Sequence, residues 1–322
     1  MGKRLDDAIG VLNGAIGDYL VRRGNGLATE LALVCDGEPV AVDRASLARA
    51  YPRASGKVVL LVHGLMNTEH AFDLEGGDYG QRLERDLDLS PLYLRYNSGR
   101  PIADNGAALA ALLERLVDAW PVPLEELILV GYSMGGLVAR SACHAGTLAG
   151  HRWLARVKRA VYVGTPHRGA PMERGGRVLS RVLAAIPDPY VRLVGEIAEL
   201  RSDGVKDLGD AELRHQDRAR RVRGWALTDA EHPVPLLPGI RHCLIAGAIS
   251  ADPWLAALFG DAVVPLASAT HHGQGELQLE TALLPAVTIL HGLHHVQIAR
   301  DPRVYDRMRA FLEEGTRTEG SA

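Results

Sequence analysis

Six short runs along this chain are rich in aliphatic residues, and several of them show no alternation with polar side chains. A strand that is apolar on both sides is buried on both faces, which is typical of a parallel sheet covered by helices. The runs therefore predict the core strands of one large sheet. They are Lys57–Val62, Pro91–Tyr96, Leu127–Val130, Ala160–Val163, His242–Ala248 and Ala286–Leu290.

Helical patterns lie between these strands. Leu109, Leu112 and Leu116 recur at helical spacing after the second strand, and the third strand is followed by a helical pattern over Leu137–Ala145. A last helix is expected to begin at Asp301-Pro302, where the aspartate caps and the proline takes the first helical position, and to run to about residue 314. Strands that alternate with helices predict an α/β fold with a doubly wound, mostly parallel sheet.

The first part of the chain precedes this alternation. Apolar residues at helical spacing predict an amphipathic helix packed on the surface of the domain, with a membrane-surface role as the alternative. These residues are Leu5, Ile9, Leu12, Ile16 and Leu20. Two strands follow, around Glu30–Cys35 and Pro39–Asp43, and Asp36-Gly37 between them predicts a hairpin. Residues 1–53 are thus expected to form a helix and a hairpin packed on the core.

A long segment interrupts the alternation of strands and helices. Residues 170–237 contain helical patterns but no core strand, and one of the helices begins at Asp188-Pro189. Such an insertion in an α/β domain is typical of a lid or cap. The core is therefore expected at residues 54–169 and 238–314, with the lid between them and a disordered tail at residues 315–322.

Composition excludes several classes of protein. The formal net charge is −3 with acids and bases mixed along the chain, so the basic footprint of a nucleic-acid-binding protein is missing. Three widely spaced cysteines form no disulfide framework and no zinc motif, and no metal or organic cofactor is expected. They are Cys35, Cys143 and Cys243.

Targeting signals are not expected either. Acidic residues at 6, 7 and 18 interrupt any apolar core of a signal peptide near the N-terminus. No run of eighteen apolar residues predicts a membrane span. We therefore expect a cytoplasmic protein.

One serine lies in a setting that points to chemistry. Gly131-Tyr132-Ser133-Met134-Gly135 follows a buried strand directly and opens a helix. This strand–turn–helix context is typical of a nucleophile elbow, in which the serine takes a strained backbone conformation. Side chains two residues to either side would collide, so Gly131 and Gly135 are the expected elbow glycines. An ordinary glycine-rich turn is the alternative.

A serine hydroxyl needs a base to take its proton. On this kind of fold the chain order is serine, then an acid, then histidine, and the base follows the last core strand. His291, His294 and His295 lie there. His295 begins the segment that leads into the final helix and is the preferred base, with His294 as the close alternative. A metal site at these histidines is disfavoured, because neither cysteine nor carboxylate stands beside them at ligand spacing.

The acid must hold the imidazole in one tautomer. Asp261 lies in the loop between the last two core strands and is the preferred candidate, with Asp252 as the alternative. An ordinary turn residue is the other interpretation of Asp261.

Backbone amides near the serine are expected to stabilise an oxyanion. Met134 follows the serine directly and supplies one amide, and Leu65 after the first core strand supplies the other. Gly64 lets that backbone approach closely. His63 is expected to orient the loop rather than act as the base, and Met66 and His63 are the candidate residues lining the substrate site. These apolar surroundings favour an acyl chain over a peptide or a sugar.

Several motifs together resemble those of α/β-hydrolase esterases and lipases, specifically bacterial proteins related to the GPI inositol-deacylase-like lipases. The resemblance covers most of residues 57–314. The motifs are His63-Gly64-Leu65, Tyr96-Asn97-Ser98-Gly99, Gly131–Gly136, Gly164–Pro171, Gly260–Pro265 and the terminal HHVQIARDPRVYDRM.

This resemblance implies an α/β-hydrolase fold with a helical lid and a carboxylic ester hydrolase. Ser133, Asp261 and His295 would be nucleophile, acid and base, with Leu65 and Met134 as the oxyanion hole. The HVQI pattern favours His295 over His294. The expected partner is a small acyl ester or a lipid, with peripheral contact to a lipid interface as a further possibility.

Three alternatives stay open. An acyltransferase and a thioesterase would use the same triad, and a basic stretch at residues 214–223 is compatible with an acyl-carrier thioester. A catalytically silent binding protein of the same fold is the third. Such a protein would normally have lost one member of the triad.

Overall fold

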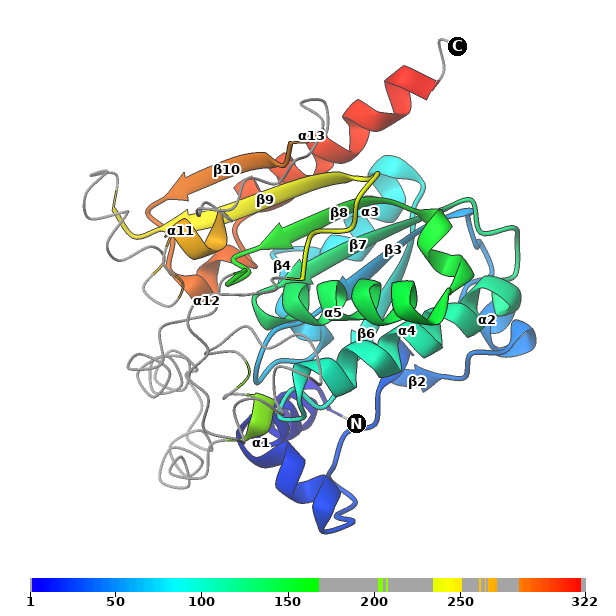
Figure 1. Ribbon diagram of the computed structural model, residues 1–322, viewed down its shortest axis with the longest axis vertical. Coiled ribbons are helices and arrows are strands. Elements are labelled where there is room, and N and C mark those ends of the chain that lie inside the picture. Colours follow the sequence, from blue (N-terminus) through cyan, green and yellow to red (C-terminus); the bar gives the residue numbers. More distant parts are fainter. Residues whose placement is uncertain are drawn as a thin grey trace.

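The computed structural model describes residues 2–167, 202–204, 207, 234–250, 261, 264, 266–270 and 284–319. Its centre is an eight-stranded sheet in the order β10-β9-β8-β7-β3-β6-β1-β2 (Figure 1). Six neighbouring strands run parallel: β10, β9, β8, β7, β3 and β6. At the other edge, β1 pairs antiparallel with β6 and with β2. The strands are β1 (Ala32–Cys35), β2 (Glu38–Val40), β3 (Lys57–Val62), β6 (Ser90–Arg95), β7 (Glu126–Tyr132), β8 (Val157–Val163), β9 (Arg241–Ala248) and β10 (Ala286–His291).

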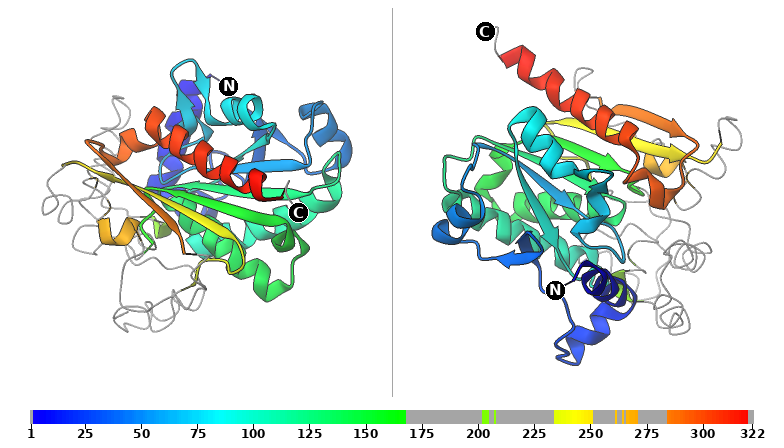
Figure 2. Two further views of the ribbon diagram at one scale, coloured as in Figure 1. Left: turned by 90° about the horizontal axis from the view of Figure 1, so that it is seen from above. Right: turned by 180° about the vertical axis from the view of Figure 1, so that it is seen from behind.

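Helices cover both faces of the sheet. The helices α4 (Ile102–Ala119) and α5 (Met134–Ala149) lie on one face, and α3 (Tyr79–Leu87) and α13 (Pro302–Glu319) lie on the other (Figures 1 and 2). The predicted doubly wound, mostly parallel sheet is thus confirmed. The smaller elements are α2 (Arg44–Ala50), η1 (Glu69–Phe72), β4 (Asp73–Leu74), β5 (Gly77–Asp78), η2 (Arg152–Arg156), α11 (Leu266–Ala269) and α12 (His295–Ile298).

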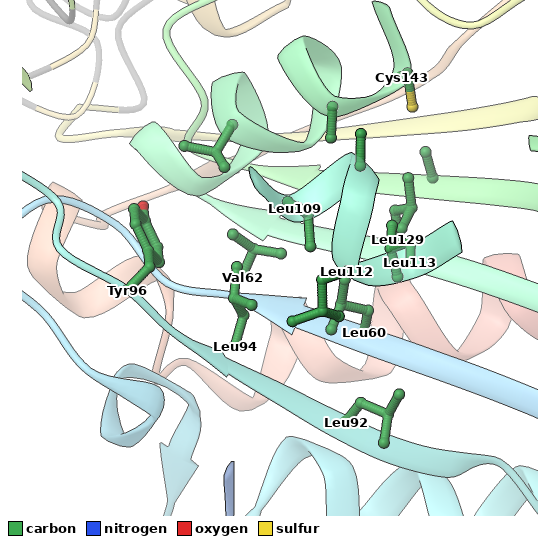
Figure 3. Packing of buried hydrophobic residues seen from close by; sticks show 14 of the residues in the cluster. Leu60, Val62, Leu92, Leu94, Tyr96, Leu109, Leu112, Leu113, Leu129 and Cys143 are labelled. Carbon is green, nitrogen blue, oxygen red and sulfur yellow. The ribbon is translucent and has the colours of Figure 1, made fainter. Parts of the chain in front are cut away.

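Two apolar layers explain why the central strands carry no polar alternation. Leu60 and Val62 of β3 pack under α4 and α5 with Leu109 and Leu113 (Figure 3). The neighbouring positions Val59 and Leu61 belong to the opposite layer, beneath α3 and α13. A strand buried on both faces needs apolar residues at every position.

The first helix, α1 (Lys3–Arg22), meets the core through a face that the apolar spacing did not identify. An amphipathic helix on a domain normally turns its apolar stripe inward. Here the buried residues include Gly10, Gly14 and Gly17, whereas Leu5 is 49% exposed. The glycine face approaches two loops of the core so closely that a Cβ on Gly14 would lie 2.7 Å from the backbone nitrogen of Met66. Leu20 is buried as expected.

Other elements also differ from the sequence prediction. The second strand, expected to end at Asp43, ends at Val40, and the short helix α2 begins at Arg44. Helix α3 was not predicted. Helix α13 runs to Glu319, so residues 315–319 are helical and the prediction of a disordered tail is wrong for them. Of the predicted lid, only residues 202–204, 207 and 234–237 are described, and the prediction of a lid lies otherwise outside the described residues.

Among the helices of the described part of the chain, none combines the length and the hydropathy that crossing a bilayer requires.

Candidate active site

The turn between β7 and α5 carries Ser133 in a strained conformation. Its φ of 52° and ψ of −125° lie in a backbone region that residues other than glycine rarely adopt. The backbone closes around it: a Cβ on Gly131 would lie 2.8 Å from the carbonyl carbon of Gly135, and one on Gly135 would lie 2.7 Å from that of Val62. Both predicted elbow glycines therefore stand where only a hydrogen fits.

A buried chain of hydrogen bonds starts at this serine. Nε2 of His295 lies 2.8 Å from Oγ of Ser133, and Nδ1 of the same ring lies 2.7 Å from Oδ2 of Asp261. All three residues are buried. The fold thus brings together three side chains from separate loops, in the order that the sequence predicted.

The base is held by groups around its ring and backbone. His295 is the first residue of α12, after β10, and its amide donates to the carbonyl of Asp261 at 3.0 Å. The Tyr132 hydroxyl donates to the His295 carbonyl at 2.9 Å, and the two rings stack with centroids 5.6 Å apart. Burial raises the pKa of Tyr132, so this hydroxyl keeps its proton. Gly164 has a φ of +58°, and a Cβ on it would lie 3.4 Å from Cε1 of the His295 ring.

The competing histidines have other contacts. His294 is exposed, and its side chain takes part in a capping box at the start of α12. His291 is exposed, and its Nδ1 lies 2.8 Å from the carbonyl oxygen of Ser250. Adjacent residues at a helix start point in different directions, and only His295 reaches Ser133.

The carboxylate of Asp261 is fixed by a second bond. Its Oδ1 accepts from the amide of Val264 at 2.7 Å, which leaves Oδ2 directed at His295. Gly247 of β9 makes room for it, because a Cβ there would lie 3.1 Å from Cβ of Asp261. The alternative acid, Asp252, lies outside the described residues.

The loop after β3 lies against the serine. A Cβ on Gly64 would lie 3.0 Å from Cβ of Ser133, so the backbone there passes the hydroxyl closely. The peptide bond between Leu65 and Met66 is held on both sides: the Met66 amide donates to Oγ of Ser98 at 3.0 Å, and the Leu65 carbonyl accepts from Asn67 at 2.8 Å. The Leu65 amide belongs to the preceding peptide, whose Gly64 carbonyl oxygen lies 2.8 Å from Nδ1 of His63, so both peptides on either side of Leu65 have a fixed contact.

The conformation of Met66 also depends on these contacts. Its φ of +58° is unfavourable for a residue with a side chain. The side chain is only 2% exposed and belongs to the core under α4 and α5. The bond to Ser98 and the packing of the side chain therefore hold a backbone conformation that would otherwise relax.

His63 shapes the same loop from inside. Its ring is fully buried and stacks on Tyr96 with centroids 4.3 Å apart, and Nδ1 lies 2.8 Å from the carbonyl oxygen of Gly64. Burial lowers the pKa of His63 to about 4, so the ring is neutral near pH 7. These contacts agree with an orienting residue. His63 and Met66 present almost no surface to solvent here, and their role as substrate-lining residues stays a prediction.

Sequence reasoning assigned no role to three residues that the structure places in this site. Ser98 lies within a quoted motif, but nothing in the sequence shows that it accepts the Met66 amide. Tyr132 lies inside the elbow, and its contact with His295 spans 163 positions of the chain. A Cβ on Gly136 would lie within 3.0 Å of the Thr165 side chain, and the GG pair in the sequence was the one available signal.

Metal-ligating groups do not gather in the part of the chain that the structure describes. No three histidine, cysteine or acidic side chains come close enough there to hold a metal ion. The hydrogen-bonded groups at Ser133 are those of acid–base and nucleophilic chemistry.

Comparison with known proteins assigns the fold. Residues 97–186 match the family model of the PGAP1-like alpha/beta domain. The lipase BlEst2 of Bacillus licheniformis superposes with a TM-score of 0.52 at 19% identity, over 88% of this chain and 97% of that chain. No curated protein has a significantly similar sequence. The predicted resemblance to α/β-hydrolase esterases and lipases is confirmed at the level of the fold.

Two further structures show weaker likeness. An esterase from Thermogutta terrifontis has a TM-score of 0.44 at 17% identity, over 81% of this chain and 91% of that chain. The Pyrococcus furiosus esterase Pf2001 has a TM-score of 0.46 at 15% identity, over 81% of this chain and 82% of that chain.

Proposed function

We propose that this α/β-hydrolase-fold protein is a carboxylic ester hydrolase that works through an acyl-enzyme on Ser133. The observation that carries the proposal is the buried chain from Ser133 through His295 to Asp261, with bonds of 2.8 and 2.7 Å. It begins at a serine whose backbone is held in a strained turn. Strain and buried polar groups cluster where they serve function.

The two bonds assign a direction to proton transfer. A carboxylate only accepts, so Asp261 favours the tautomer with the proton on Nδ1 of His295. Nε2 is then free to take the proton of the Ser133 hydroxyl as Oγ bonds to the ester carbonyl carbon. The carbonyl electron pair moves to the oxygen, which becomes an oxyanion.

The second half of the reaction returns the groups to their initial state. The oxyanion collapses, the bond to the alcohol oxygen breaks, and Nε2 gives its proton to that oxygen. Water then attacks the acyl-enzyme with His295 again as the base, and the acid is released. Two backbone amides, those of Leu65 and Met134, would donate to the oxyanion in both steps.

Apolar surroundings support an acyl chain as the substrate group. Leu65 follows the loop residue Gly64 that passes Ser133, and Met134 follows the serine directly, so the residues next to the nucleophile are apolar. A single polar chain in an apolar setting is typical of small-molecule sites, where a few groups fix orientation and the rest bind apolar surface. A thioesterase or acyltransferase would use the same groups, but the basic stretch that favoured a thioester lies outside the described residues.

The first test is the reactivity of Ser133 itself. The wild-type chain should react with a fluorophosphonate, and the adduct should map by mass spectrometry to Ser133. kcat/KM on p-nitrophenyl esters of two to sixteen carbons should fall on the order of 10⁴–10⁶ in Ser133→Ala. Ser141→Ala is a matched control, because Ser141 is a buried serine on the same helix α5.

The outcomes separate the candidate functions. Activity retained in Ser133→Ala would refute the proposal. A labelled Ser133 with no ester hydrolysis, but with transfer from a CoA thioester or to an added alcohol, would identify the thioesterase or the acyltransferase instead. No labelling of the folded wild type would favour the silent binding protein.

A further inference from the structure

Helix α1 carries its apolar stripe on the outside. Leu5 and Tyr19 are 49% and 45% exposed, and the residues between them on that face are half-buried. Val21 and Leu27 continue the exposed apolar surface just beyond. Four of the eight exposed large hydrophobic residues in the described part of the chain thus lie within residues 5–27. The stripe consists of Leu5, Ile9, Leu12 and Tyr19; Ile16, where the helix is kinked, packs partly against the core.

The acidic residues of this helix face inward. Asp6 is buried 3.6 Å from the Arg95 guanidinium, and Asp7 accepts from the Thr68 hydroxyl at 3.0 Å. Asp18 is buried and pairs with Arg22 at 3.1 Å. The outer surface of α1 therefore shows little negative charge.

The basic residues of this helix face outward, at both ends of the apolar stripe. Lys3 and Arg4 lie at one end, and Arg22 and Arg23 lie at the other, all four exposed. Lys3 pairs with Asp73, and Arg22 pairs with Asp18 and Asp203, whereas Arg4 and Arg23 have no ion pair among the described residues. Arg23 stacks its guanidinium 5.3 Å from the centre of the Tyr19 ring. An apolar stripe flanked by cations is the pattern of a helix that lies in a membrane interface.

The inner side of this helix touches the candidate active site. A Cβ on Gly10 would lie 3.0 Å from the carbonyl oxygen of Asn67, and one on Gly14 would lie 2.7 Å from the Met66 amide. The same loop passes Ser133 at Gly64. In Figure 1, α1 lies apart from the helices that cover the two faces of the sheet. A surface that α1 contacts would therefore lie one loop away from the nucleophile.

We propose that the outer face of α1 docks on an anionic lipid surface. The apolar stripe enters the interface, and the basic residues at both ends contact headgroup phosphates. A second copy of the chain fits this face poorly, because any two-fold pairing of α1 brings basic ends against basic ends. The further step, in which the docked protein presents lipid esters to Ser133, rests on the proposed function. The docking itself does not depend on it.

Vesicle binding tests the proposal without any need for catalysis. The full chain, as Ser133→Ala so that lipids stay intact, is sedimented with vesicles of phosphatidylcholine containing about a third phosphatidylglycerol, and with phosphatidylcholine alone. We expect binding to the anionic vesicles that weakens with salt. Leu5→Glu with Tyr19→Glu should reduce the partition coefficient at least tenfold, because each change removes exposed apolar surface and adds a negative charge.

Controls separate docking from misfolding and from self-association. Leu148→Glu changes a residue that is 77% exposed at the end of α5 and should bind like the parent. In a chain that keeps Ser133, the double variant Leu5→Glu with Tyr19→Glu should hydrolyse a soluble short ester at the wild-type rate and unfold at the wild-type temperature. If the parent ignores anionic vesicles, or the double variant binds as well as the parent, the proposal is wrong. An oligomer that the same two changes disperse would mean that a second copy covers α1.

Discussion

Replacing Gly14 by alanine asks whether α1 sets the position of the loop that carries Leu65 and Met66. The added Cβ would lie 2.7 Å from the backbone nitrogen of Met66 and 2.8 Å from its Cα. Ordinary contacts of a Cβ begin near 3.4 Å. Because both atoms belong to the backbone, no change of rotamer relieves the contact, and either the helix or the loop has to move by more than half an ångström.

Two opposing effects decide the change in stability. Alanine favours the helix by about 1 kcal/mol relative to glycine. Overpacking of a close interface costs about 1–3 kcal/mol, and the upper part of that range applies where backbone is displaced. We expect Gly14→Ala to lower the free energy of unfolding by about 1–2 kcal/mol, and Tm by about 1.5–3 °C for a chain of this size.

The rate should respond more strongly than the stability. A displaced Met66 loosens its bond to Ser98 and turns the Leu65 amide away from the oxyanion, and misplacement by about 1 Å can cost about a hundredfold. The assay is kcat and KM on a soluble p-nitrophenyl ester with Tm from circular dichroism. Gly26→Ala is the matched control, because a Cβ there meets nothing within 4 Å. If Gly14→Ala keeps the kcat and Tm of Gly26→Ala, α1 does not position this loop.

Two further predictions concern buried groups. Ser98→Ala leaves the Met66 amide without its acceptor; we expect a loss of about 1–3 kcal/mol in stability and a lower kcat at nearly constant KM, with partial rescue by Ser98→Thr. Burial lowers the pKa of His242 to about 4 from an ordinary 6.5, so the unfolded chain binds more protons between these values and stability falls as the pH falls. When the pH is lowered from 7 to 5, the free energy of unfolding measured with urea should fall by about 2 kcal/mol less in His242→Gln than in the wild type. An equal fall in both proteins would contradict the prediction.

The central strands could be predicted because nearly every residue in them is apolar. β3 has the predicted bounds, Lys57–Val62, since a strand covered on both faces admits few polar residues. Ser133, Asp261 and His295 could be selected for a different reason. The carboxyl ends of parallel strands meet at one edge of the sheet, so loops distant in sequence converge there. The choice between His294 and His295 depends on the first turn of α12, which periodicity does not resolve.

Other elements carried weak or misleading signals. Helix α3 buries only Tyr79, Gly80 and Leu83, so its apolar pattern is too sparse to identify a helix. The last helix was expected to end near residue 314, but α13 continues through Gly315 to Glu319. Glycine at a helix end favours termination only where the chain also turns away.

Helix α1 shows why periodicity alone does not determine packing. The spacing of Leu5, Ile9, Leu12 and Ile16 identifies a helix correctly but says nothing about which face meets the core. Glycines on the opposite face let the backbone approach Asn97 and Met66 more closely than any side chain could. Contact at that distance displaces the apolar stripe outward. The signal lay in the glycine spacing at 10, 14 and 17, which predicts a close approach only when a partner loop is known.

The same arrangement ties two properties of α1 to opposite faces, which makes them separable. Changes on the inner face, such as Gly14→Ala, act on the loop beside Ser133 and leave the outer stripe and its basic ends in place. Changes on the outer face, such as Leu5→Glu, leave the contacts with Met66 intact. Inner-face variants should therefore lose turnover of soluble esters but still bind anionic vesicles, and outer-face variants should lose vesicle binding but keep that turnover. If a change on one face abolishes both ester turnover and vesicle binding, the two faces of α1 are not independent of each other.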